Sequence, residues 1–234
     1  MPCCRSGGSL LLFWILAKDS PERLAPRPLA HYLHVLRYAD AVWFRFFYAV
    51  TFGGVISLAS SLVLYFHDHF ALAPRQAGAV TALCLLAAAL CRPVGGWAAD
   101  RFGGIRTVKT ILVLAAVMLV ILAGSPEKHL PTAIGAIACA LAALGAGNGA
   151  LFQLVSIRFR RQMGVVTGLV GMAGGLGGLL FTYAFGLLRT ATGGYAAGFA
   201  VYAALVVVAL FGLWSVKRRW RTTWGAPQAT SAHV

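Results

Sequence analysis

Charged side chains are scarce in this 234-residue sequence: they make up 11% of it, against roughly 25% in soluble domains. Hydrophobic residues account for 59%. This composition excludes an ordinary soluble domain. It predicts an integral membrane protein, because a hydrocarbon core of ~30 Å needs about 20 apolar residues for each helical crossing.

Catalytic and metal-binding patterns are also missing. There are only six acidic residues, and of these only Asp100 lies beside an apolar run in a motif-like context. The five cysteines have no metal-ligand spacing, and no phosphate-binding loop of the Gly-x-x-x-x-Gly-Lys-Ser/Thr type occurs. The His-Asp-His triplet at 67–69 is a run of adjacent loop residues, which rarely converge on one ion. We therefore expect no enzymatic activity, no metal site and no cofactor.

Long apolar runs are what the sequence does contain. Six of them are long enough to cross the bilayer: 42–66, 76–99, 107–124, 130–155, 163–188 and 195–216. A further apolar run has only nine residues, 9–17, and cannot span. We interpret 1–17 as the tail of a preceding helix, 18–41 as a cytoplasmic linker, 42–216 as a six-helix transmembrane unit and 217–234 as a basic cytoplasmic tail.

Basic residues give the chain a net charge of +14. They gather before the first span, between the second and third, between the fourth and fifth, and after the last, while the other connections hold one each. This alternation is the positive-inside pattern of membrane proteins. It predicts a multi-pass protein of the inner (plasma) membrane with both termini in the cytoplasm, contacting lipid and no nucleic acid.

Three polar or aromatic features inside the spans indicate a cavity. Arg92 lies eight residues before Asp100, about 12 Å along a helix, and an arginine inside the bilayer costs roughly 2.5–3.5 kcal/mol. It is either a structural arginine reaching toward the cytoplasm or an anion site. Asn148 lies in the fourth span and needs a partner. Tyr48 and Phe52 lie four residues apart, on one helical face, and could enclose a small ligand.

Glycine is abundant, with 27 residues. In the fifth span, glycines recur every three to four residues at Gly168, Gly171, Gly174, Gly175 and Gly178. Such a stripe allows close contact between helices in lipid. Two interpretations remain open: simple packing, or a helix that slides against its neighbour beside a transport pathway.

The segment "RPVGGWAADRFGGIR" at 92–106 resembles the Gly–Asp–Arg–Gly loop motif of the major facilitator superfamily, which lies between the second and third helices of a six-helix unit. The resemblance implies that Asp100 and Arg101, with Gly96 and Gly103, form a cytoplasmic gate. Asp100 is then expected near the start of the fifth span, where the helix dipole favours an anion.

Segments 47–68, 145–178 and 216–225 narrow this resemblance to the bacterial nitrate/nitrite porter family. Members of that family have twelve helices in two halves. This chain resembles the end of the sixth helix followed by helices seven to twelve. The resemblance implies an all-α half-bundle that carries nitrate or nitrite by alternating access, together with a separate N-terminal half or a second copy. The alternative is a truncated, non-transporting membrane protein or an assembly module.

The resemblance also implies the substrate site. Arg92 matches the arginine of the C-terminal half, Tyr48 and Phe52 match aromatic residues of the seventh helix, and Gly168 and Gly171 match signature positions beside the anion. Some relatives carry a hydroxyl at the position of Gly171. The cavity residue Asn148 completes the predicted substrate-binding set. The sequence does not separate nitrate from nitrite, or uptake from exchange.

Overall fold

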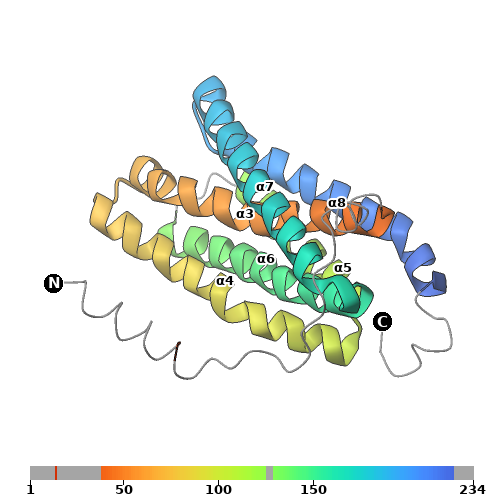
Figure 1. Ribbon diagram of the computed structural model, residues 1–234. Coiled ribbons are helices and arrows are strands. Elements are labelled where there is room, and N and C mark those ends of the chain that lie inside the picture. Colours follow the sequence, from red (N-terminus) through yellow and green to blue (C-terminus); the bar gives the residue numbers. More distant parts are fainter. Residues whose placement is uncertain (1–13, 15–37, 125–128, 224–234) are drawn as a thin grey trace.

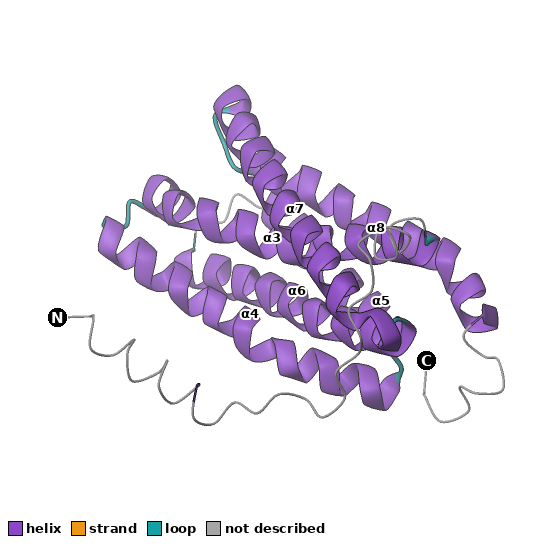
Figure 2. Cartoon of the chain, viewed as in Figure 1, coloured by secondary structure: helices purple, strands orange, loops and turns teal. Residues whose placement is uncertain are grey.

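Six long helices build the protein, as seen in the computed structural model, which describes Trp14 and residues 38–124 and 129–223 (Figure 1). They are α3 (Ala39–Phe70), α4 (Pro74–Phe102), α5 (Gly104–Gly124), α6 (Leu130–Arg158), α7 (Met163–Thr192) and α8 (Ala196–Thr223), with the short 3₁₀ helix η2 (Arg160–Gln162) before α7. All six are long and apolar enough to cross a membrane. Figure 2 shows only helices and loops in the described part of the chain. The predicted all-α six-span fold is confirmed.

The helices extend past several predicted span ends. α3 begins at Ala39 inside the predicted linker, and α8 continues to Thr223 inside the predicted tail. Both extensions carry polar or basic residues, which a hydrophobicity criterion excludes but a helix outside the bilayer core tolerates. The predicted stub at 1–17 and the rest of the linker lie, apart from Trp14, outside the described residues.

The connection between α4 and α5 is a single glycine. Gly103 alone joins α4 to α5, with φ at 92°. Residues other than glycine rarely adopt this backbone conformation. Gly103 therefore allows the chain to reverse between two spans. The Thr107 hydroxyl donates to the Gly103 carbonyl at 3.0 Å and lies 3.2 Å from the Ala98 carbonyl, which fixes the reversal.

The helices pack in pairs through small residues. α4 packs along α6, α3 along α7, and α5 lies against both α6 and α8. A Cβ atom added at Gly95 of α4 would collide with the backbone of Ala146 on α6, and one added at Gly145 would collide with the backbone of Ala88. Backbone contact of this kind needs residues without side chains and supplies the van der Waals attraction that holds helices together in lipid.

Two helices are much less covered than the rest. In their most apolar windows, 22% of α4 and 28% of α7 are buried, against 39–50% in the other four spans. Large apolar side chains therefore project outward from α4 at Leu83, Leu86, Leu90, Val94 and Trp97, and from α7 at Met172, Leu176, Leu179, Leu180, Tyr183 and Leu187. We refer to the exposed sides of α4 and α7 as the open face of the bundle.

Candidate anion-binding site

Arg92 meets the predicted aromatic pair in space. Its Nη2 donates a hydrogen bond to the Tyr48 hydroxyl at 3.2 Å, and its guanidinium carbon lies 5.0 Å from the centre of the Phe52 ring. Tyr48 and Phe52 come from α3, and Arg92 comes from α4, 44 residues away from Tyr48. The cation is thus held between a phenolic oxygen and an aromatic face, which attracts it electrostatically.

The aromatic rings form a fixed wall. Tyr48 and Phe52 are stacked with ring centres 5.1 Å apart and planes at 17°, and Phe152 of α6 meets Tyr48 edge-on at 5.0 Å. Gly174 of α7 completes the wall: a Cβ there would lie 2.7 Å from Tyr48 and 2.8 Å from Phe52. Position 174 therefore lets α7 approach the pair. The glycine stripe was visible in the sequence, but which of its members touches the aromatic wall was not.

Asn148 lies on the same side of α6 as Phe152, since residues four apart share a helical face. It is 1% exposed, and its Oδ1 has no hydrogen-bond partner among the described residues. A buried carbonyl oxygen without a hydrogen-bond donor costs free energy. The nearby polar residue Gln153 points elsewhere, toward Gly104 at the start of α5.

Gly168 and Gly171 lie on the outer surface of α7. A Cβ at either position would meet no atom within 4 Å. They precede Gly174 by six and three residues, but Gly174 is buried against α3, whereas Gly168 is exposed and Gly171 is half-buried. The structure does not bring Gly168 or Gly171 into contact with Arg92; it places them on the open face.

Of the predicted gate residues, Gly96, Asp100 and Arg101 lie within α4 and not in a loop, and Gly103 forms the connection to α5. Asp100 and Arg101 are exposed at the end of α4, and within the described part of the chain neither makes a hydrogen bond or ion pair. A Cβ added at Gly96 would lie 3.8 Å from the Gly149 carbonyl oxygen, so Gly96 borders the contact between α4 and α6. Among the described residues, Asp100 makes no hydrogen bond with the start of α7, and its side chain is exposed.

A buried carboxylate that the sequence did not single out lies at the same end of the bundle. Asp40 is 6% exposed and accepts hydrogen bonds from Arg158 Nε at 2.8 Å, from Trp220 Nε1 at 2.9 Å and from Arg219. It joins the start of α3 to the ends of α6 and α8. We call this set the Asp40 cluster.

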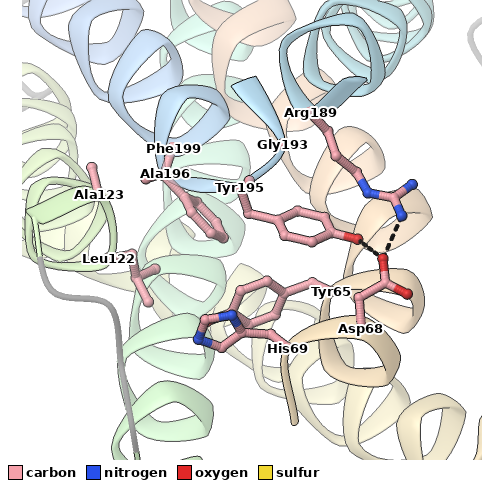
Figure 3. A pocket seen from close by; sticks show the side chains of 11 residues that line it. Tyr65, Asp68, His69, Leu122, Ala123, Arg189, Gly193, Tyr195, Ala196 and Phe199 are labelled. Carbon is pink, nitrogen blue, oxygen red and sulfur yellow. Dashed lines mark hydrogen bonds and ion pairs between the residues drawn. The ribbon is translucent and has the colours of Figure 1, made fainter. Parts of the chain in front are cut away.

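At the opposite end lies a pocket of about 520 Å³ beside Asp68 (Figure 3). The Asp68 carboxylate accepts hydrogen bonds from the Tyr195 hydroxyl at 2.7 Å and from Arg189. Burial, together with the carboxylate, raises the pKa of Tyr195 above its ordinary value. Because Asp68 neutralises Arg189, this pocket offers no excess positive charge. Arg92, in contrast, has no ion-pair partner among the described residues, so it is the better anion site.

We expect the ion pair of Asp68 with Arg189 to contribute little to the free energy of unfolding. Both side chains are about a third exposed, and exposed pairs contribute about 0–1 kcal/mol because water screens them. We expect Asp68→Asn to lower the free energy of unfolding by less than about 1 kcal/mol. Thermal unfolding of the purified variant in detergent tests this value, and a large loss of stability would contradict it.

Comparisons with known proteins show the family to which the chain belongs. The family described as Major Facilitator Superfamily matches residues 7–182 and 46–231. The nitrite extrusion protein of Bacillus subtilis (strain 168) is 33% identical over 189 residues, which cover 80% of this chain and 47% of that protein.

Two further relatives agree with these matches. The probable nitrate/nitrite antiporter NarK1 of Thermus thermophilus is 34% identical over 184 residues, which cover 68% of this chain and 40% of that protein. The probable nitrate/nitrite transporter NarK2 of Mycobacterium tuberculosis (strain ATCC 25618 / H37Rv) is 34% identical over 167 residues, covering 70% and 42%. The chain thus spans about half the length of the curated relatives that it matches. With six membrane-spanning helices and a family match over most of its length, the chain belongs to the Major Facilitator Superfamily of membrane transporters.

Proposed function

We propose that this chain carries the C-terminal half of the substrate pathway of a nitrate/nitrite transporter, with Arg92 as its anion-binding residue. The observation that carries the proposal is a membrane-embedded arginine that has no ion-pair partner among the described residues and is held against Tyr48 and Phe52. A cation within a membrane span is costly, so charged residues there are rare and commonly mark a functional site. The names of the relatives, which refer to nitrate or nitrite, support the choice of anion.

The chemistry of the three side chains suits a small planar oxyanion. A guanidinium group presents five N–H donors in one plane, and among the described residues Arg92 uses one of them, on Tyr48. Because the Tyr48 oxygen accepts that bond, its own proton remains available to donate to an anion. Phe52 covers one face of the guanidinium and limits the space beside it. We further propose that the Asn148 amide donates to the same anion.

The open face over α4 and α7 fits a carrier built from two bundles. Gly168 and Gly171 would border the pathway on this face, and they supply no side-chain hydrogen bond. We propose that a six-helix N-terminal half, or a second copy of the chain, covers the face, and that transport follows by alternating access between the two bundles. We place both termini in the cytoplasm, because the basic connections lie at that end.

Nitrate uptake into proteoliposomes tests this function. The chain is reconstituted alone, and also together with the N-terminal six-helix half of the Bacillus subtilis relative, with co-purification used to verify that the two halves assemble. We expect uptake of nitrate or nitrite only from the assembled pair, and none of chloride. Assembled pairs that carry neither nitrate nor nitrite would contradict the proposal. So would an Arg92→Gln variant that takes up these anions as fast as the wild type.

A further inference from the structure

The Asp40 cluster lies two helical turns from the proposed anion site, on the same helix. Asp40 precedes Tyr48 by eight residues of α3, about 12 Å at the usual helical rise. A buried carboxylate is stable only when its charge is compensated and its oxygens are hydrogen-bonded. Asp40 meets both conditions through two arginines and an indole N–H.

Two structural routes link Asp40 to the surroundings of Tyr48: one ends at Phe47, the residue before Tyr48, and the other runs along α6 to Phe152, which contacts the Tyr48 ring. The first runs through α8: Trp220 donates to Asp40, stacks on Phe44 with ring centres 4.8 Å apart, and meets Phe47 edge-on at 6.2 Å. Phe44 and Phe47 are the α3 residues one turn and one residue before Tyr48, and both are fully buried.

The second route runs through α6. Arg158 donates its Nε proton to Asp40 and thereby ties the end of α6 to the start of α3. Phe152, six residues earlier on α6, packs edge-on against Tyr48. The separation between Asp40 and Arg158 along the sequence is 118 residues. The Asp40 carboxylate therefore links the ends of the two helices that carry Tyr48 and Phe152.

We infer that Asp40 is a positioning residue for the anion site: by holding α3, α6 and α8 together at the basic end, it keeps Tyr48 in the orientation that receives Arg92. The expected effect of Asp40 on nitrate binding rests on the proposed function. The structural content of the inference concerns the contact between Tyr48 and Arg92, which is measurable without any substrate. A strained or displaced site residue loses activity steeply, since misplacement by about 1 Å can cost about a hundredfold.

A fluorine-labelled tyrosine at position 48 of the full chain gives the required readout. Its ¹⁹F resonance depends on the adjacent ring and on the guanidinium at 3.2 Å. We expect Asp40→Asn, which keeps the shape and removes the charge, to shift or split this resonance in the absence of nitrate, and Asp40→Glu to restore part of it. Asp68→Asn is the matched control, because it removes the equivalent carboxylate at the other end of α3, and it should leave the resonance unchanged.

Three outcomes are informative. An unchanged resonance in Asp40→Asn overturns the inference, whatever happens to nitrate transport. If Asp40→Asn does not fold, Arg219→Gln replaces it: this change removes a single, partly exposed donor and should produce a smaller shift of the same kind, while no shift overturns the inference.

Nitrate measurements then separate this inference from the proposed function. In the assembled pair, Asp40→Asn should raise the nitrate concentration for half-maximal uptake about tenfold while Asp68→Asn leaves it unaltered. A wild-type pair that carries no nitrate, but whose Tyr48 resonance still responds to Asp40→Asn, contradicts the proposed function alone.

Discussion

Arg92→Lys is expected to reduce nitrate uptake by the assembled transporter about a hundredfold, even though the positive charge is kept. Lysine presents a compact ammonium, whereas a planar oxyanion is best held by two parallel N–H donors of a guanidinium. Lysine also cannot keep both present contacts, because the hydrogen bond to Tyr48 and the position over Phe52 use the extended guanidinium plane. The loss corresponds to about 2.7 kcal/mol of binding or transition-state free energy.

The measurement is the initial rate of nitrate uptake into proteoliposomes across a range of nitrate concentrations. Arg75→Lys is the matched control: Arg75 is also on α4 but is exposed at its first turn, and we expect wild-type uptake from it. Uptake by Arg92→Lys within a few-fold of wild type would show that the positive charge alone suffices. It would contradict the proposed binding of the anion by two parallel N–H donors.

The second large effect concerns helix packing. We expect Gly145→Ala on α6 to destabilise the chain by about 1–3 kcal/mol, the usual cost of overpacking a tight interior. The new methyl group would overlap the carbonyl of Ala88 on α4. Because the obstacle is backbone, a rotamer change cannot relieve it, and the two helices must separate.

Gly135→Ala is the control on the same helix. A Cβ there would meet no atom within 4 Å, and alanine has a better helix propensity than glycine by roughly 1 kcal/mol. We therefore expect opposite signs for the same substitution: a lower midpoint of thermal unfolding in detergent for Gly145→Ala and an equal or slightly higher one for Gly135→Ala. Equal midpoints would show that the close contact of α4 with α6 is unimportant for stability.

Much of this fold could be predicted from the sequence because lipid imposes a simple requirement on it. A helix that crosses the bilayer must be predominantly apolar over about 20 residues, so the spans are visible as apolar runs. Family membership confirms a transporter rather than an enzyme. The meeting of Arg92 with Tyr48 and Phe52 was implied by the family resemblance and is formed in the structure. Their part in binding nitrate stays a prediction.

The parts that could not be predicted depend on contacts between distant helices. Asp40 reads locally as an ordinary polar residue before an apolar span, and its partner Arg219 lies 179 residues away. No spacing or periodicity connects two such residues. Conversely, Asp100 lies in a recognisable motif but is exposed, because a motif records a local sequence and not the surface that covers it. The choice of Gly174 over Gly168 and Gly171 as the contact with the aromatic wall likewise depends on how α7 is rotated.

The two carboxylates of α3 also have a consequence for how the protein lies in the bilayer. Asp40 and Asp68 are 28 positions apart (68 minus 40), which corresponds to about 42 Å along a helix, more than the ~30 Å of the hydrocarbon core. Each is tied to arginine at its own end of the bundle. A vertical shift of α3 by one or two turns would draw one of these charged clusters into hydrocarbon. The helix therefore has a set depth, and a thinner or thicker bilayer must adapt to it by bending its lipids or tilting the whole bundle.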